Sequence, residues 1–270
     1  MLLHCLLLAG TFTFPGQEDI YLEEIVSANY KGRVIWFAPH ENENVVNDYL
    51  AQKIRREGGR FLILRQAGQR NIALRFGSRV YEVDPNRIFT ANGASSSLTR
   101  LNPQLKQDQQ ALKQALDRAN ALGKFILESM GNPGRRHVLI AIHNNTDGYD
   151  NDGKNGRGTV SINRYQKRFE AGAGYILDLN LGQGDEDDLF FITSKKDFRR
   201  MRKAAWPTVL QHPRVATDPS QDDGSLSVYA AMIGARYINI EAQRKEGDDH
   251  LAIQKYMVDF VYALRGIRGR

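Results

Sequence analysis

Three polar side chains in this 270-residue sequence have the types and spacing of a catalytic metal site. His40 and Glu43 form a His-x-x-Glu pair, which a tight turn or a first helical turn would place on one side of the chain. His143 follows much later in the sequence. A catalytic zinc ion typically takes two histidines and one carboxylate from the protein and leaves its fourth position to water. The pattern therefore predicts one zinc ion (Zn2+) held by His40, Glu43 and His143.

Two of these groups and one further carboxylate each follow an apolar segment that we expect to be a buried strand. They are His40 after residues 33–38, His143 after residues 137–142, and Glu241 after residues 237–240. Open α/β sheets bind ligands beyond the carboxyl ends of their strands. Burial there would raise the pKa of Glu241 and suit it to accept a proton from an attacking water. The alternative is a carboxylate at the rim of the site, paired with Arg244 or Lys245.

The Asn-Arg-x-Phe motif at residues 86–89 makes the pattern more specific. His-x-x-Glu, then Asn-Arg-x-Phe, then a strand-end His and a strand-end Glu resembles the zinc carboxypeptidase superfamily, which includes the succinylglutamate desuccinylase and aspartoacylase branch. The resemblance implies roles for six residues: zinc ligands at His40, Glu43 and His143, a substrate carboxylate held by Asn86 and Arg87, and Glu241 as the general base.

Arg87 also has the chemistry to bind a carboxylate. A guanidinium forms two charge-assisted hydrogen bonds with a carboxylate, and a neighbouring asparagine can add another. The alternative role for Arg87 is a surface ion pair with Asp84 or Glu82. Pro85 stands where the family more often has Leu, which stiffens the approach to Asn86. We therefore expect a substrate that ends in a free carboxylate.

The predicted activity is zinc-dependent hydrolysis of an amide bond next to a free carboxylate, in a peptide or a peptidoglycan-type peptide, as in a metallocarboxypeptidase. The alternative is an N-acyl amino acid deacylase of the succinylglutamate desuccinylase/aspartoacylase type, which the sequence of residues 143–146 favours. A module that binds carboxylate-ended ligands without turnover is a third hypothesis. The resemblance also implies an arginine that polarises the scissile carbonyl, for which Arg75, Arg79 and Arg157 are candidates without a motif.

Short apolar runs alternate with helical stretches from residue 33 onward, which is typical of crossover units around a largely parallel sheet. We expect a single α/β domain with a mixed, mostly parallel sheet flanked by helices, and the resemblance implies a zinc-carboxypeptidase-like arrangement. Among the expected elements are strands at 33–38, 61–64, 137–142, 159–162 and 237–240, and helices at 45–57, 104–130, 195–210 and 251–264. The polar loop at 147–156 is expected to act as a lid.

Composition and the start of the chain set the remaining expectations. The formal net charge is +6, but Lys and Arg are scattered among 31 acidic residues, so no nucleic-acid partner is indicated. Residues 1–15 are either a signal segment or a first strand, and residues 16–270 form the predicted zinc hydrolase domain. A cleaved signal would place the protein in the periplasm or outside the cell. Without such a signal, the expected location is the cytoplasm. The expected partner is a small peptide or N-acyl amino acid with a free carboxylate, without stable membrane association.

Overall fold

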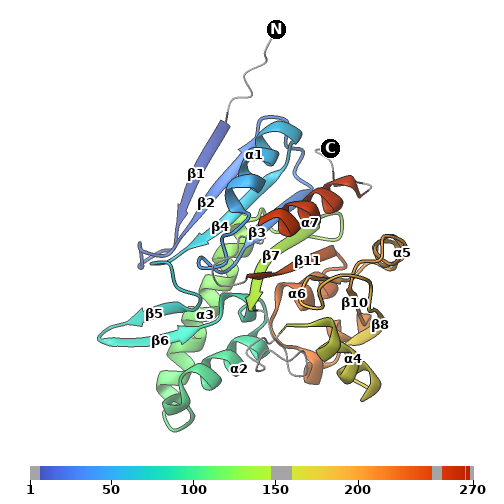
Figure 1. Cartoon of the computed structure of the whole chain (residues 1–270). Coiled ribbons are helices and arrows are strands. Elements are labelled where there is room, and N and C mark those ends of the chain that lie inside the picture. The colour runs from blue at the N-terminus through green and yellow to red at the C-terminus, as the bar shows by residue number, and fades with distance from the viewer. Residues whose placement is uncertain (1–6, 147–159, 245–250, 265, 268–270) are drawn as a thin grey trace.

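A nine-stranded sheet with the order β1-β2-β4-β3-β7-β11-β9-β10-β8 forms the centre of the computed structural model (Figure 1). The strands are β1 (Leu7–Thr13), β2 (Tyr21–Ser27), β3 (Val34–Ala38), β4 (Arg60–Arg65), β7 (Val138–Thr146), β8 (Ile176–Asn180), β9 (Leu189–Ile192), β10 (Thr208–Gln211) and β11 (Arg236–Arg244). The four central strands, β4, β3, β7 and β11, are parallel, and antiparallel pairs lie on both sides of them. The prediction of an α/β domain with a mixed sheet is confirmed.

Helices cover both faces of the sheet (Figure 1). The apolar core on one face includes α1 (Asn47–Glu57), α5 (Lys195–Lys203) and α7 (Leu251–Ala263). The core on the other face includes α2 (Ala91–Leu101), α3 (Gln109–Ser129) and α6 (Leu226–Met232), whereas α4 (Ile162–Glu170) packs near β8, β9 and β10. A separate hairpin consists of β5 (Ile72–Phe76) and β6 (Arg79–Val83).

The structure describes residues 7–146, 160–244, 251–264 and 266–267. The expected lid at 147–156 lies outside these ranges. Residues 7–13 form β1 and residues 1–6 are outside the described part, so the choice between a signal segment and a first strand stays a prediction, as do the domain bounds. Among the described helices, none is long and apolar enough to cross a membrane.

Two predicted elements are wrong. The helix expected at 195–210 ends at Lys203, because Ala205 takes a positive φ of 57° and Pro207 has no amide hydrogen with which to continue a helix. The chain then continues as β10. The strand expected at 159–162 is absent over its described residues 160–162: Ile162 begins α4, and the Ser161 side chain caps the helix by accepting a hydrogen bond from the Asn163 N–H.

Alternation along β7 and β11 sets the face on which the site lies. Leu139, Ala141 and Tyr237 belong to the core beneath α2, α3 and α6, while their even-numbered neighbours belong to the opposite core. Successive side chains of a strand point to opposite faces. His143 and Glu241 continue the odd-numbered series and stand opposite each other in the β7–β11 register, so both point to the face of α2, α3 and α6.

The segment that carries Asn86 and Arg87 is fixed by close backbone contacts on two sides. A Cβ atom on Gly93 of α2 would lie 2.0 Å from the Cα of Gly224, and one on Gly123 of α3 would lie 2.2 Å from the carbonyl oxygen of Ile88. Real Cβ atoms do not approach other atoms so closely. Helix α3 therefore contacts Ile88 next to this segment, and α2 packs against Gly224. A Cβ atom on Gly224 would in turn lie 2.3 Å from the carbonyl oxygen of Arg87, so all three contacts require glycine.

We expect Gly93→Ala to destabilise the fold by about 1–3 kcal/mol, because the added methyl group forces α2 away from Gly224. Helix propensity alone would make this variant more stable than the wild type, since alanine is favoured over glycine in a helix by about 1 kcal/mol. Urea denaturation measures the difference. Gly134→Ala is the matched control, because nothing lies within 4 Å of its added Cβ. A Gly93→Ala variant at least as stable as the wild type would refute the close contact.

Candidate metal centre

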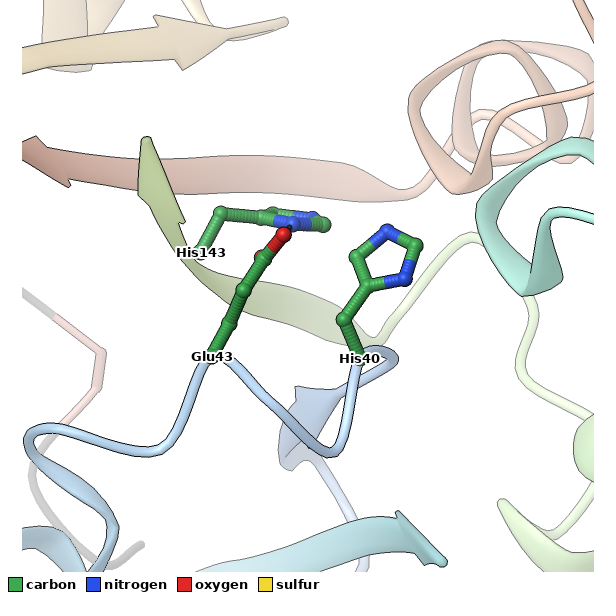
Figure 2. A group of neighbouring side chains, drawn as sticks. All are labelled: His40, Glu43 and His143. Carbon is green, nitrogen blue, oxygen red and sulfur yellow. Dashed lines mark hydrogen bonds and ion pairs between the residues drawn. The ribbon is translucent and has the colours of Figure 1, made fainter. Parts of the chain in front are cut away.

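His40, Glu43 and His143 lie together beyond the carboxyl end of β3 and on β7 (Figure 2). Their candidate ligand atoms are all within 4.8 Å of one another, and the two imidazole centroids are 5.2 Å apart. A turn in which the Glu43 N–H donates to the His40 carbonyl oxygen at 3.1 Å places the first two side chains on one side. The three residues are 1%, 4% and 3% exposed, respectively. This buried group could hold one metal ion.

The protonation of both imidazoles suits a metal ligand. Burial, followed by the charge of the neighbouring His143, lowers the pKa of His40 to about 3, and burial also lowers the pKa of His143. Both rings are therefore neutral near pH 7, the form in which an imidazole nitrogen can bind a metal.

The two ring nitrogens of His40 have different neighbours. Nδ1 lies 3.1 Å from the carbonyl oxygen of Arg70, and Nε2 lies 3.6 Å from the Asp84 carboxylate. Because a carbonyl oxygen only accepts hydrogen bonds, Nδ1 carries the hydrogen and donates to Arg70, and Nε2 keeps the lone pair that a metal could bind. Nε2 is buried and has no hydrogen-bond partner within the described ranges. An unsatisfied buried nitrogen beside a second imidazole and a carboxylate fits the ligand set of zinc.

A network of amide groups supports the metal ligands from behind. The Asn144 N–H donates to Glu43 Oε2 at 3.2 Å, and the Asn144 side chain accepts from the Val45 N–H at 3.4 Å. Asn144 Nδ2 also donates to Gln254 Oε1 at 3.1 Å, and Gln254 Nε2 donates to the carbonyl oxygen of His143 at 3.2 Å. Gln254 is fully buried on α7. Helix α7 thus helps to hold both ligand segments in place.

Arg70 is a site residue that the sequence analysis missed. It lies between β4 and β5, donates a hydrogen bond to Glu43 Oε1, and lines the cleft with its side chain half-exposed. The proposed candidates Arg75 and Arg79 instead lie on the β5–β6 hairpin, paired with acidic side chains away from the cleft, and Arg157 is outside the described residues. No motif marks Arg70, whose only signal is its position in a loop that follows a central parallel strand.

Asn86 reaches the metal group directly. Its Nδ2 lies 3.4 Å from His143 Nε2, and its Oδ1 accepts from the Leu226 N–H at 3.2 Å. The Asn86 N–H donates to Asp84 Oδ1 at 2.9 Å. Burial acts to raise the pKa of Asp84, but the adjacent imidazole, two nearby guanidinium groups and this N–H bond together lower it below its ordinary value. Asp84 therefore stays charged beside His40 and orders the motif that carries Asn86.

Arg87 lies in the same cleft, with about a third of its side chain exposed. Its Nη1 donates to Asp223 Oδ2 at 2.6 Å. The carboxylate that accepts this hydrogen bond from Arg87 is thus that of Asp223 and not one of the two considered from the sequence, although Asp84 also lies near the guanidinium. Glu82 is exposed and accepts a hydrogen bond from Asn71. The distant Asp223 carries no sequence signal that could have identified it.

Glu241 stands next to His143 across the β7–β11 pair and is half-buried. Its Oε1 accepts from Asn239 Nδ2 at 2.9 Å. The alternative partner Arg244 also lines the cleft but donates to the carbonyl oxygen of Asn42 at 3.3 Å, while Lys245 is outside the described residues. The carboxylate is therefore placed beside the metal group with one amide donor.

These residues line a cleft of about 920 Å³, together with Tyr165 of α4 and Tyr237 of β11. Burial, followed by the negative charge of Glu241, raises the pKa of both phenols, so their hydroxyl groups stay protonated. The predicted residues that line the cleft are Glu43, Asn86, Arg87, His143 and Glu241.

The sequence matches no protein-family model and no curated protein. Two solved structures show a distant likeness. The succinylglutamate desuccinylase from Chromobacterium violaceum is 14% identical with a TM-score of 0.46, over 97% of this chain and 70% of that one. A proposed metallopeptidase from Shewanella baltica OS155 is 12% identical with a TM-score of 0.41, over 94% of this chain and 85% of that one. Likeness at this level leaves the activity to be argued from the site.

We expect Gln254→Leu to weaken zinc binding by about 10- to 100-fold, because Asn144 and the His143 carbonyl lose the group that orients them. Competition with a chromophoric chelator measures the dissociation constant. Gln166→Leu is the control, since Gln166 lies on α4 outside the cleft lining. Equal zinc affinity in both variants would show that the amide network does not support the metal ligands.

Proposed function

We propose that this protein is a zinc-dependent hydrolase that cleaves an amide bond next to a free carboxylate. The observation that carries the proposal is the buried group of two neutral imidazoles and one carboxylate at the edge of a polar cleft. Two histidines and one carboxylate are a usual protein ligand set of catalytic zinc. When bound, the ion would supply Lewis-acid polarisation of the scissile carbonyl and lower the pKa of water at its open position.

Arg87 and Asn86 would orient the substrate. The Arg87 guanidinium can hold a carboxylate through two parallel charge-assisted hydrogen bonds. Asp223 already holds one edge of the guanidinium, which limits its freedom before the substrate arrives. The Asn86 amide lies between this clamp and His143, so a carboxylate bound to Arg87 keeps the adjacent amide bond close to the metal group.

Glu241 would serve as the general base and later as the general acid. Its position next to His143 supports proton transfer from the attacking water, followed by delivery of that proton to the leaving nitrogen. The Asn239 amide holds one carboxylate oxygen and leaves the other for the water. Arg70, whose half-exposed guanidinium lies beside Glu43 and lines the cleft, would stabilise negative charge on the carbonyl oxygen.

A peptide with a free carboxyl end is the leading substrate class, with a peptidoglycan-type peptide as one form of it. An N-acyl amino acid would use the same groups, and deacylation remains the alternative. The Asn144 amide, part of the motif that favoured deacylation, bonds to Val45, Gln254 and the Ala242 carbonyl. It therefore has a structural role, which removes part of the support for a deacylase. Release of a terminal amino acid from peptides, compared with release of acetate or succinate from N-acyl amino acids, separates the two.

We expect Glu241→Gln to lower kcat by about 10²- to 10⁴-fold, because an amide cannot accept the proton of the attacking water. Zinc content should stay at the wild-type level, since Glu241 is not among the three candidate ligands. Steady-state kinetics on zinc-loaded protein, together with metal analysis, provide the test. Undiminished turnover in this variant would remove Glu241 from the mechanism.

Arg87→Met should remove the preference for a free carboxylate. The loss of charge-assisted hydrogen bonds worth about 1.5–3 kcal/mol lowers kcat/KM roughly 10- to 100-fold for a free-acid substrate. The carboxamide form of the same substrate, which cannot form the charged contact, should change little. The test is to measure kcat/KM for both substrates in the wild type and in the variant. A parallel loss on both substrates would mean that Arg87 has only a structural role.

A further inference from the structure

The wall of the cleft that continues from Arg87 and its exposed partner Asp223 includes the buried polar side chains of Gln211, Ser225 and Ser227. The Ser225 N–H donates to Asp223 Oδ1 at 3.0 Å, and Asp223 is the residue that pairs with Arg87. The hydroxyl groups of Ser225 and Ser227 are 2.9 Å apart, and Gln211 Nε2 donates to the Ser227 carbonyl oxygen at 3.0 Å. All five residues line the cleft. This wall therefore adjoins the carboxylate clamp without a break.

Strand β11 contributes Tyr237 and Asn239 to the same part of the cleft. Both alternate with residues of the opposite core and so share a face with Glu241. Asn239 is 8% exposed, and its Oδ1 is buried with no hydrogen-bond partner in the part of the chain that the structure describes. The orientation of this amide is set by Glu241, because an ionised carboxylate only accepts hydrogen bonds and must face Nδ2. Oδ1 is thus an acceptor that lacks a donor.

The chemistry of these residues limits what can bind against them. The side chains of Gln211, Ser225, Ser227, Tyr237 and Asn239, defined here as the polar pocket, carry no formal charge. An apolar group would leave Asn239 Oδ1 unsatisfied, and a carboxylate would meet this oxygen and the charge of Glu241. An ammonium group would lose its hydration in a pocket of neutral groups, or would pair with Glu241 and occupy the proposed base.

We propose that the polar pocket binds the side chain of the substrate residue that carries the free carboxylate, and selects an uncharged side chain ending in a hydrogen-bond donor, such as the carboxamide of glutamine. The inference rests on the proposed function, since the Arg87 clamp fixes the carboxylate next to the pocket. A carboxamide donates to Asn239 Oδ1 through its NH₂ group and accepts from a serine or tyrosine hydroxyl through its oxygen. Asn239 would then donate a hydrogen bond to Glu241 and accept one from the substrate side chain.

Binding of free amino acids to zinc-loaded protein tests the pocket without any turnover. Glutamine, methionine, glutamate and lysine have side chains of similar length but differ in charge and in donor groups. Isothermal titration calorimetry should give a dissociation constant for glutamine at least about tenfold lower than for each of the other three. Equal or tighter binding of methionine, glutamate or lysine would overturn the proposal, as would the absence of binding by all four. A preference for glutamate would point instead to the arginines of α4 that line the cleft.

Asn239→Leu keeps a similar side-chain volume and removes the acceptor. The ratio of the methionine dissociation constant to the glutamine dissociation constant should therefore fall to about 1. Asn163→Leu is the matched control, because Asn163 is exposed on α4 outside the cleft lining and should keep the wild-type ratio. An unchanged ratio in Asn239→Leu would reject the role of Asn239. Selective glutamine binding without hydrolysis of any amide would contradict the proposed function alone, whereas hydrolysis without preference for the terminal side chain would contradict the pocket alone.

Discussion

The contact between the Glu43 carboxylate and the His143 imidazole, 2.8 Å apart and both buried, is the interaction on which the rest of the site depends. A carboxylate is costly to bury unless several groups compensate its charge. Here the Asn144 N–H, the Arg70 guanidinium and the imidazole itself surround Glu43. A bound metal ion would add the largest compensation of all, and the turn that includes His40 brings a second imidazole to the same point.

The parallel centre of the sheet makes this contact geometrically available. Strands β3, β7 and β11 run side by side in one direction, so the residues near their carboxyl ends lie close together. The metal group arises from two of these strands, and Glu241 comes from the third in register with His143. The close contacts of Gly224 with Arg87 and of Gly123 with Ile88 then hold the Asn86 and Arg87 segment at the same edge. Main-chain packing therefore places the metal group, Glu241, Asn86 and Arg87.

The sequence predicted the parts of the site that lie on periodic elements. His143 and Glu241 follow apolar runs and lie within β7 and β11, which continue to Thr146 and Arg244. His40 is tied to Glu43 by a short spacing, so local pattern predicted the positions of all four. Arg70 and Asp223 could not be predicted, because each reaches the site from a loop whose partner lies far away in the chain. The helix expected at 195–210 was predicted too long for a similar reason. Its residues favour a helix, but the chain turns at Ala205, and the residues beyond it pair as β10 with β8 and β9. Tertiary packing decided these cases.

Zinc K-edge X-ray absorption on protein loaded with one equivalent of zinc tests the metal group most directly. We expect a first shell of nitrogen and oxygen ligands at about 2.0–2.1 Å with outer-shell scattering from two imidazoles. The outer-shell scattering from imidazole should be half of the wild-type signal in His40→Ala, and also half of it in His143→Ala. A shell without imidazole scattering, or a spectrum that neither substitution changes, would show that zinc binds elsewhere and that these three side chains are not its ligands.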